Sequence, residues 1–204
     1  ASGGMTGLLS APIEMERHQI EVVSRVLNDP VQRYLLADEV GLGKTIEAGV
    51  ILRQHLLDNP NSHFALIIVP EGLVNQWVTE LYERCQISSS RYGHRVEVIA
   101  HSEALDWKKG QPDFVVVDEA HQLVGDNPRF NWLRRVSSPE NCSKLLLLSA
   151  TPVLRNENGF LALLHLLDPL VNRLEDADLF SERIANRQDL ANLFGEFVED
   201  QDVF

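Results

Sequence analysis

Hydrophobic residues alternate along the chain between short continuous runs and stretches with helical spacing. The continuous runs predict buried strands, and the spaced stretches between them predict amphipathic helices. Alternation of this kind is typical of a parallel sheet with helices on both faces, so we expect an α/β fold. The predicted strands lie near residues 33–37, 65–69, 95–99, 114–118 and 145–149.

Apolar stripes predict three helices besides the one that begins near Lys44. A helix near 157–167 carries mostly leucines on its buried side. A second stripe follows the spacing i, i+3, i+4 and i+7, so Trp77 is expected in the core rather than as a stacking platform for nucleic acid; its members are Val74, Trp77, Val78 and Leu81. The first helix spans roughly 14–28 and ends at Asn-Asp-Pro; its expected buried stripe is Ile20, Val23, Val26 and Leu27.

The loop that follows the first predicted strand has the composition of a phosphate-binding loop. Gly41 and Gly43 permit positive φ angles, so that successive backbone N–H groups can point at phosphate oxygens. Lys44 would contact the β- and γ-phosphates, and the Thr45 hydroxyl would bind Mg²⁺. The helix that begins near Lys44 would add the positive end of its dipole.

This loop departs from the strict P-loop pattern, because Asp38 stands where that pattern has glycine. An ordinary strand-to-helix turn is therefore an alternative explanation of the loop. Its context favours phosphate binding, because a buried strand precedes it and a mostly apolar helix follows. Gly49 in that helix is expected to permit close packing on a sheet.

A second candidate site follows the strand over residues 114–117. Asp118 and Glu119 come directly after three valines, at the carboxyl end of the strand, where open α/β sheets bind ligands. Asp118 is expected to hold Mg²⁺, and Glu119 to orient and deprotonate the water that attacks the γ-phosphate. The alternative is a solvated strand end, where acidic residues are common.

Two weaker signals accompany these sites. Ser149 and Thr151 end another buried strand and could report the nucleotide state through hydrogen bonds to carboxylate or histidine groups. Gln19 lies on the first predicted helix, and its amide can both donate to and accept from the N6/N7 edge of adenine. Each is also compatible with a plain turn or a surface residue.

Three sequence motifs together resemble those of the superfamily 2 helicase-like ATPases. Asp-Glu-Val-Gly-Leu-Gly-Lys-Thr (38–45) resembles motif I, Asp-Glu-Ala-His (118–121) motif II and Leu-Ser-Ala-Thr-Pro (148–152) motif III. The form of motif I, with Asp38 in place of glycine, is similar to that of SWI/SNF-type translocases, and Glu-Ala-Gly (47–49) fits their bacterial RapA-like branch.

This resemblance implies a RecA-like P-loop NTPase lobe that uses ATP and Mg²⁺. It assigns Gln19 to the adenine-reading motif, Lys44, Asp118, Glu119 and His121 to catalysis, and Thr45 with Asp118 to the metal. The residues implied in coupling are Ser149, Ala150 and Thr151. Those implied in nucleotide binding besides Gln19 are Asp38, Glu39, Val40, Gly41, Leu42, Gly43, Lys44 and Thr45.

The resemblance further implies an ATPase whose complete protein tracks double-stranded DNA with two RecA-like lobes. At 204 residues the chain has room for one such lobe, so the second, with its arginine fingers, is expected to be missing. An arginine finger is worth about 10³–10⁵ in turnover, so we expect the isolated lobe to be nearly inactive. The expected organisation is a tag remnant or disordered start (1–11), the ATP-binding lobe (12–170) and an acidic helical extension or linker (171–204).

Charge neither supports nor opposes a nucleic-acid partner. The net charge is −12, from 18 basic and 30 acidic residues, and nine acidic residues lie in 175–202. No apolar run is long enough to span a membrane, and the two cysteines, Cys85 and Cys142, lack metal-ligand spacing. A bacterial cytoplasmic location is expected.

Two other functions stay open. A nucleotide-gated interaction module would keep the fold without productive hydrolysis, but intact Lys44, Thr45, Asp118 and Glu119 argue against a degenerate site. An RNA helicase of the DEAH-box type would share residues 118–121, but such proteins usually carry a Thr-Gly-Ser-Gly-type loop, which this chain lacks.

Overall fold

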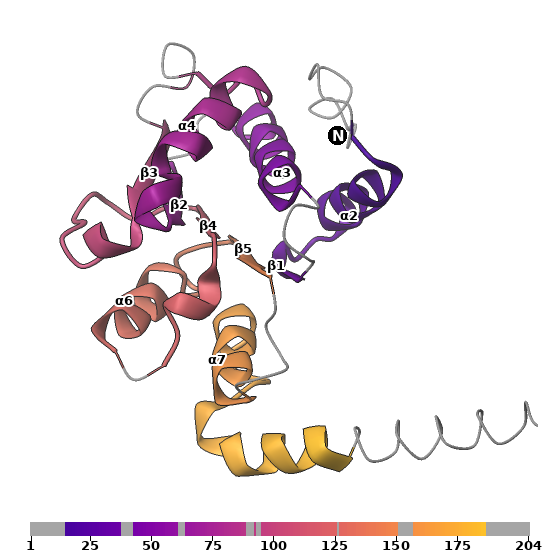
Figure 1. Ribbon diagram of the computed structural model, residues 1–204, viewed down its shortest axis with the longest axis vertical. Helices are drawn as coiled ribbons and strands as arrows, with labels where there is room; N and C mark the ends of the chain where they lie inside the picture. The colour runs from indigo at the N-terminus through magenta and orange to yellow at the C-terminus, as the bar shows by residue number, and fades with distance from the viewer. Residues whose placement is uncertain are drawn as a thin grey trace, which may run out of the picture.

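A five-stranded sheet forms the centre of the protein (Figure 1). The computed structural model describes residues 15–37, 43–60, 64–88, 92, 95–125, 127–150 and 157–186. All neighbouring strands pair in parallel, in the order β1-β5-β4-β2-β3. The strands are β1 (Arg33–Ala37), β2 (Ala65–Val69), β3 (Val96–Ala100), β4 (Phe114–Val117) and β5 (Lys144–Ser149).

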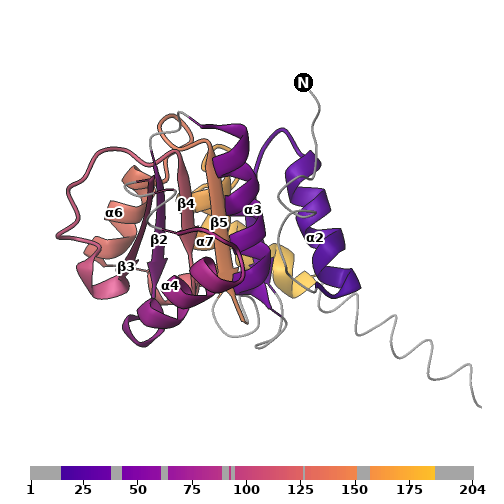
Figure 2. The same ribbon diagram turned by 90° about the horizontal axis from the view of Figure 1, so that it is seen from above.

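Helices cover both faces of this sheet (Figures 1 and 2). On one face lie α3 (Lys44–Asp58) and α4 (Val74–Glu83), with α2 (Arg17–Asn28) packed against α3. On the other face lie α6 (Pro128–Val136) and α7 (Glu157–Leu167), and residues 177–186 are also helical. The short 3₁₀ turns are η1 (Glu71–Leu73), η3 (His101–Glu103), η4 (Ala120–Gln122) and η5 (Leu174–Asp176).

Successive residues of each central strand enter different cores, because side chains alternate across a pleated sheet. Ile67 and Val116 pack with α3 and α4, whereas Leu66 and Val115 pack with α6 and α7. All four side chains are fully buried. Continuous apolar strands are therefore what this doubly covered sheet requires, and the predicted α/β fold is confirmed.

Strand register brings the carboxyl ends of three strands to one edge of the sheet. Ala37 at the end of β1 pairs with Ser149 at the end of β5, and Val117 at the end of β4 pairs with Leu147. Asp118, one residue beyond β4, donates its N–H to the Ile68 carbonyl of β2 at 2.8 Å. The segments that follow β1, β4 and β5 thus emerge beside one another.

Several expected details differ in the structure. The first helix begins at Arg17 rather than near residue 14. Ile20 is 39% exposed, because the residues that α2 buries are Gln19, Val23 and Val26. Of the stripe expected in α4, Trp77 and Leu81 are buried, whereas Val78 is 51% exposed.

Gly49 permits close packing against a different neighbour from the one expected. A Cβ at this position would lie 2.4 Å from the Cys85 Sγ and near Leu81, at the end of α4, rather than against the sheet. Cys85 and Cys142 are free and buried, and burial raises their pKa values to about 12 and about 11. Both thiols therefore stay protonated at neutral pH.

Arg33 joins several segments at the amino edge of the sheet. Its guanidinium donates to the carbonyls of Ser137, Cys142, Leu166 and Leu167 at 2.6–2.9 Å. Two of these carbonyls end α7 and one follows α6, where a helix leaves its last carbonyls unsatisfied and favours a cation. Burial lowers the pKa of Arg33 from its ordinary value, although the group remains charged.

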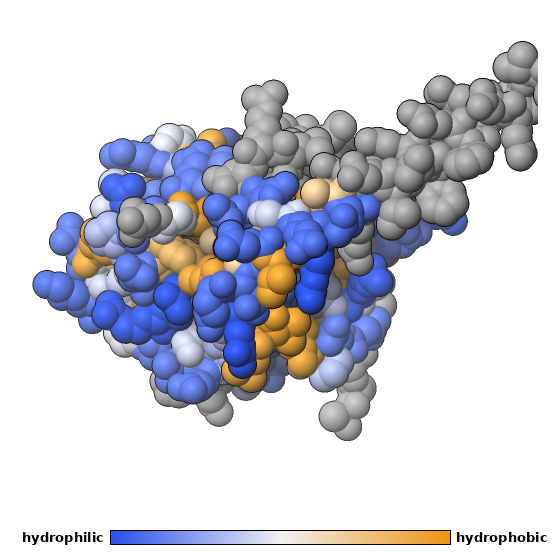
Figure 3. Space-filling model, turned by 90° about the horizontal axis from the view of Figure 1, so that it is seen from below, coloured by the Kyte–Doolittle hydropathy of each residue, from blue (hydrophilic) through white to orange (hydrophobic). Residues whose placement is uncertain are grey.

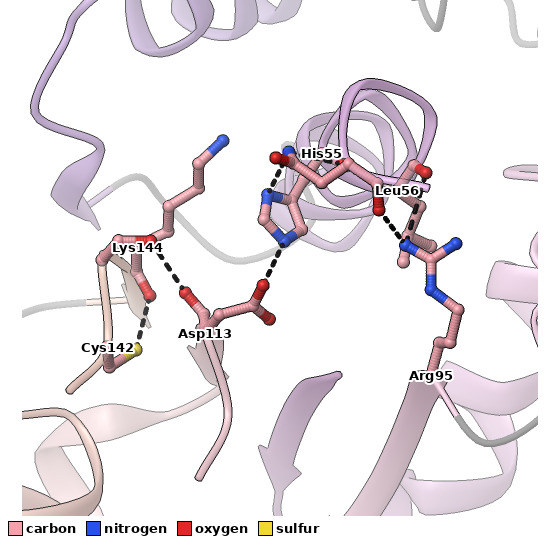
Figure 4. A network of polar contacts seen from close by, with 8 residues as sticks. His55, Leu56, Arg95, Asp113, Cys142 and Lys144 are labelled. Atoms are coloured by element: carbon pink, nitrogen blue, oxygen red, sulfur yellow. Dashed lines mark hydrogen bonds and ion pairs between the residues drawn. The ribbon is translucent and has the colours of Figure 1, made fainter. Parts of the chain in front are cut away.

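A second polar network at this edge joins α3 to the starts of β4 and β5 (Figure 4). His55 lies 3.5 Å from an Asp113 oxygen through Nε2, and Asp113 accepts the Lys144 N–H at 3.2 Å through its carbonyl. Burial lowers the pKa of His55 to about 4. Arg95 extends the network to the end of α3, where it donates to the carbonyls of Leu56 and Asn59.

The segment after α7 carries an apolar surface at the lower end of the molecule in Figure 1. Leu170, Val171 and Leu179 are 83%, 74% and 56% exposed. The view from below shows hydrophobic side chains gathered there among hydrophilic neighbours (Figure 3). Among the described residues, no helix is long and apolar enough to cross a membrane.

Candidate active site

The loop after β1 ends at Gly43, which caps the N-terminus of α3. Gly43 has φ +86°, a left-handed conformation that favours glycine, and its carbonyl accepts the N–H groups of Ile46 and Glu47. Lys44 and Thr45 are the first two residues of the helix, so they stand at the positive end of its dipole. Asp38, Glu39, Val40, Gly41 and Leu42 lie outside the described residues.

Gln19 lies directly against this loop. It is buried in α2, and a Cβ added to Gly43 would lie 2.0 Å from its Nε2. The Gln19 Oε1 also accepts the Glu16 N–H at 2.9 Å, in a capping box that begins the helix. The structure therefore brings Gln19 to the predicted nucleotide loop, where a surface glutamine was the alternative.

Asp118 follows β4 and is 8% exposed. Trp77 of α4 donates its indole N–H to Asp118 Oδ2 at 2.8 Å, and the Glu119 N–H reaches Oδ1 at 2.9 Å. His101 Nε2 lies 2.9 Å from the Asp118 carbonyl, and because a carbonyl only accepts, Nε2 carries the proton. Burial lowers the pKa of His101.

Glu119 has φ +47°, a left-handed angle that is uncommon for residues other than glycine and that often marks functional sites. Its Oε2 lies 3.3 Å from His121 Nδ1, and that nitrogen is 3.1 Å from Ser149 Oγ. Ala120 between them is fully buried and anchors the turn in the core. The predicted hydrogen bond from the end of β5 to a histidine is thus present.

Ser149 is fully buried and Ala150 follows it at the same edge, whereas Thr151 lies outside the described residues. Apart from Gln19 on α2, the predicted residues that are described therefore lie at or directly after the ends of β4 and β5, or at the start of α3. No cluster of three or more histidine, cysteine or acidic residues that could hold a metal ion occurs in the described part of the chain. Mg²⁺ in nucleotide enzymes is commonly held by one or two carboxylates plus substrate phosphates, and Asp118 and Thr45 offer donors of that kind.

Sequence reasoning missed the hydrogen bonds to Asp118 from Trp77 and His101. A buried tryptophan usually finds a partner for its N–H, so the prediction that Trp77 enters the core already implied an acceptor. Nothing in the spacing of the chain indicates which acceptor, because 41 residues separate Trp77 from Asp118. Nothing in the sequence around His101 predicted its contact with the Asp118 carbonyl.

Comparison with known proteins gives the family. Residues 16–98 match the model of the SNF2-related domain. The chain is 33% identical over 222 residues to the RNA polymerase-associated protein RapA of Pseudomonas fluorescens, covering 96% of this chain and 23% of that protein. It is 35% identical to the RapA of Vibrio atlanticus, covering 87% of this chain and 21% of that protein. The chain therefore spans about a quarter of the length of these relatives.

Solved structures show the same fold at lower identity. The Sulfolobus solfataricus SWI2/SNF2 ATPase core in complex with double-stranded DNA has a TM-score of 0.68 at 17% identity, over 82% of this chain and 38% of that one. The helicase domain of Pyrococcus furiosus Hef has a TM-score of 0.56 at 18% identity, over 74% of this chain and 35% of that one. The chain thus carries an SNF2-related domain, is related to part of the RapA proteins, and has the fold of the SWI2/SNF2 ATPase core.

Proposed function

We propose that this chain is the ATP-binding first lobe of a two-lobe motor that couples ATP hydrolysis to movement on duplex DNA. The observation that carries the proposal is that two residues with positive φ angles, Gly43 and Glu119, lie on loops at the same edge of a parallel sheet. Gly43 shapes the start of α3 for phosphate, and Glu119 places a carboxylate after β4.

The described residues fit Mg-ATP. A Cβ at Gly43 would lie 2.0 Å from Gln19 Nε2, so glycine is what lets the Gln19 amide pack against the start of α3. The first N–H groups of α3 and its positive dipole end suit a phosphate group. Lys44 and the amides of the loop would hold the phosphates, and Gln19 the adenine. Thr45 and Asp118 would hold Mg²⁺, which when bound neutralises charge that develops on the phosphates.

Glu119 would orient and deprotonate the attacking water. Its contact with His121, and the contact of His121 with Ser149, lead from the catalytic carboxylate to β5. We assign Ser149, Ala150 and Thr151 to the coupling of nucleotide state with lobe closure, and residues 38–42 to the phosphate cradle. The second lobe would supply the remaining catalytic cations.

Duplex DNA as the track is supported by the fold shared with the Sulfolobus core, which was solved with double-stranded DNA. Residues 12–170 would form the lobe and 171–204 an extension toward the second lobe. The bacterial cytoplasmic location stays a prediction.

Nucleotide binding by the 204-residue chain tests the site. Lys44→Ala should weaken the binding of Mg-ADP roughly 10- to 100-fold, the worth of one charge-assisted hydrogen bond. Lys109→Ala is the matched control, because Lys109 is exposed and pairs with Glu97 of β3. Equal affinity of the two variants, measured by calorimetry, would contradict the assignment.

Turnover by the two-lobe protein tests the motor. We expect ATP hydrolysis to be stimulated more by duplex DNA than by RNA, and expect this chain alone to turn over ATP very slowly. Equal hydrolysis with and without nucleic acid would favour a nucleotide-gated module, and stronger stimulation by RNA would favour an RNA helicase.

A further inference from the structure

Trp77, which the sequence placed in the core rather than among the candidate site residues, contacts the candidate metal carboxylate. It lies in the first half of α4, is 1% exposed, and donates its N–H to Asp118 Oδ2 at 2.8 Å. We propose that Trp77 is a positioning residue that holds the Asp118 carboxylate in the orientation required by the Mg²⁺ of the bound nucleotide. This inference rests on the proposed function.

The hydrogen bond is more than the satisfaction of a buried indole. A backbone carbonyl would satisfy the N–H of Trp77 equally well, but its acceptor is a carboxylate, so the bond is charge-assisted and stronger than a neutral one. Asp118 is itself only 8% exposed, so water competes weakly for the same oxygen. The pair therefore fixes the side chain of Asp118 as well as that of Trp77.

Both carboxylate oxygens of Asp118 are held from the protein side. Trp77 binds Oδ2, and the Glu119 N–H binds Oδ1 at 2.9 Å. Rotation of the carboxylate would break both bonds. Each oxygen keeps a second lone pair, which is available to a metal ion or to a water that coordinates one.

The backbone of Asp118 is held equally firmly. Its N–H donates to Ile68 of β2 at 2.8 Å, and its carbonyl accepts from His101 at 2.9 Å. All four polar atoms of the residue thus have protein partners, contributed by β2, α4, η3 and the adjacent Glu119. Of these partners Trp77 alone reaches the side chain from a different segment of the chain, so it sets the rotamer.

Groups that orient a metal ligand in this way affect metal binding more than they affect folding. Loss of such a partner typically lowers metal affinity about 10- to 100-fold. A tryptophan that served only to fill the core would instead change stability and leave the Mg²⁺ dependence of binding unaltered. This difference separates the two roles.

The test is Trp77→Phe, which removes the donor and keeps an aromatic ring in the core. Trp132→Phe is the matched control, because Trp132 is also buried, but lies in α6 on the opposite face of the sheet. The affinity of the 204-residue chain for ADP is measured across a Mg²⁺ titration and again in EDTA. We expect Trp77→Phe to raise the Mg²⁺ concentration required about 10-fold or more, with ADP affinity in EDTA unchanged. Trp132→Phe should alter neither.

Wild-type Mg²⁺ dependence in folded Trp77→Phe overturns the role of Trp77 and leaves the proposed function standing. Absence of Mg²⁺-dependent ADP binding in the unaltered chain overturns both. A second measurement keeps Trp77 in place: with Trp107→Phe and Trp132→Phe combined, Trp77 is the sole tryptophan of the three in the chain. Its fluorescence should change with Mg-ADP and not with ADP in EDTA, and Asp118→Asn should abolish the change. A signal insensitive to Mg-ADP would also overturn the proposal.

Discussion

At the amino edge of the sheet Arg33 donates to four backbone carbonyls, whereas at the carboxyl edge Trp77 donates to a carboxylate. Both edges bury polar groups and hold them with short hydrogen bonds. The amino edge uses its cation to satisfy carbonyls at the ends of helices, which is a structural task. At the carboxyl edge the hydrogen bonds orient the Asp118 carboxylate, whose remaining lone pairs can still bind a metal ion.

Backbone conformation separates the edges further. Glu119 has φ +47° between a buried strand and the start of η4, where no helix C-terminus requires a left-handed residue. Gln86 has φ +54°, but it follows α4, and the Ile87 N–H bonds to the Leu81 carbonyl at 2.8 Å. A left-handed residue in that place is a common way for a helix to end. A buried polar network alone therefore does not identify a functional site. A positive φ angle that the end of a helix does not explain is the more selective sign of one.

The comparison predicts the largest effect for Glu119→Gln in the two-lobe protein. An amide keeps the shape of the side chain but cannot accept the proton of the attacking water, so turnover should fall about 10²- to 10⁴-fold with little change in nucleotide affinity. The matched control is Glu140→Gln, an exposed residue near the amino edge. Steady-state hydrolysis with duplex DNA measures both, and comparable rates for the two variants would remove Glu119 from catalysis.

Arg33→Met is expected to have the next largest effect, on stability rather than on binding. The change leaves four carbonyls at the amino edge without their donor, which should cost about 2–5 kcal/mol in the free energy of unfolding. Urea denaturation of the 204-residue chain measures this cost. Arg135→Met, at an exposed position of α6, should stay within about 0.5 kcal/mol of the unaltered chain. A small loss in Arg33→Met would mean that water satisfies these carbonyls.

The His55 network predicts a pH dependence that comes from the amino edge. Burial lowers the native pKa of His55 to about 4 from 6.5, so between these values the unfolded chain binds a proton that the native chain does not. Stability should therefore fall by about 2–3 kcal/mol as the pH drops from 6.5 toward 4. The Asp113 carboxylate opposes this shift in pKa, whereas Lys144 and Arg95 reinforce it.

His55→Gln isolates this effect, because its amide does not titrate and can still accept from Asn59, which lies 3.3 Å from His55 Nδ1. The unfolding free energy of this variant should vary less between pH 7 and pH 4.5 than that of the unaltered chain. His101, whose pKa is also lowered, contributes equally to both proteins and cancels in the difference. Parallel curves for the two proteins would show that His55 titrates normally in the native state.

The sequence predicted the α/β layering because every central strand is a continuous apolar run, as a sheet covered on both faces requires. The exposure of Val78 was not predictable, because helical spacing indicates which residues share a face but not how wide the covered part of that face is. The same limit applies to Ile20 on α2, which is 39% exposed.

The places of the candidate residues in the fold were predictable where they follow from local spacing, as for Gly43 before Lys44 and for the acidic pair after β4. Contacts between distant segments were not. Arg33 begins an apolar strand and gives no indication that its acceptors lie more than 100 residues away. Trp77 was expected in the core, but tertiary packing decided that its acceptor is Asp118.

Ser149→Ala is expected to have the smallest effect, and it has a matched control at the opposite edge. Ser149 bonds to His121 at 3.1 Å at the carboxyl edge, and Ser137 donates to the Leu133 carbonyl at 2.8 Å at the amino edge. Both are fully or almost fully buried, so either change to alanine should cost about 1 kcal/mol in unfolding free energy. Only Ser149→Ala should also lower DNA-stimulated turnover of the two-lobe protein, by about 2- to 10-fold, the worth of one neutral hydrogen bond in the link between β5 and Glu119. Equal turnover in the two variants would mean that the contact between Ser149 and His121 is structural, like its counterpart at the amino edge.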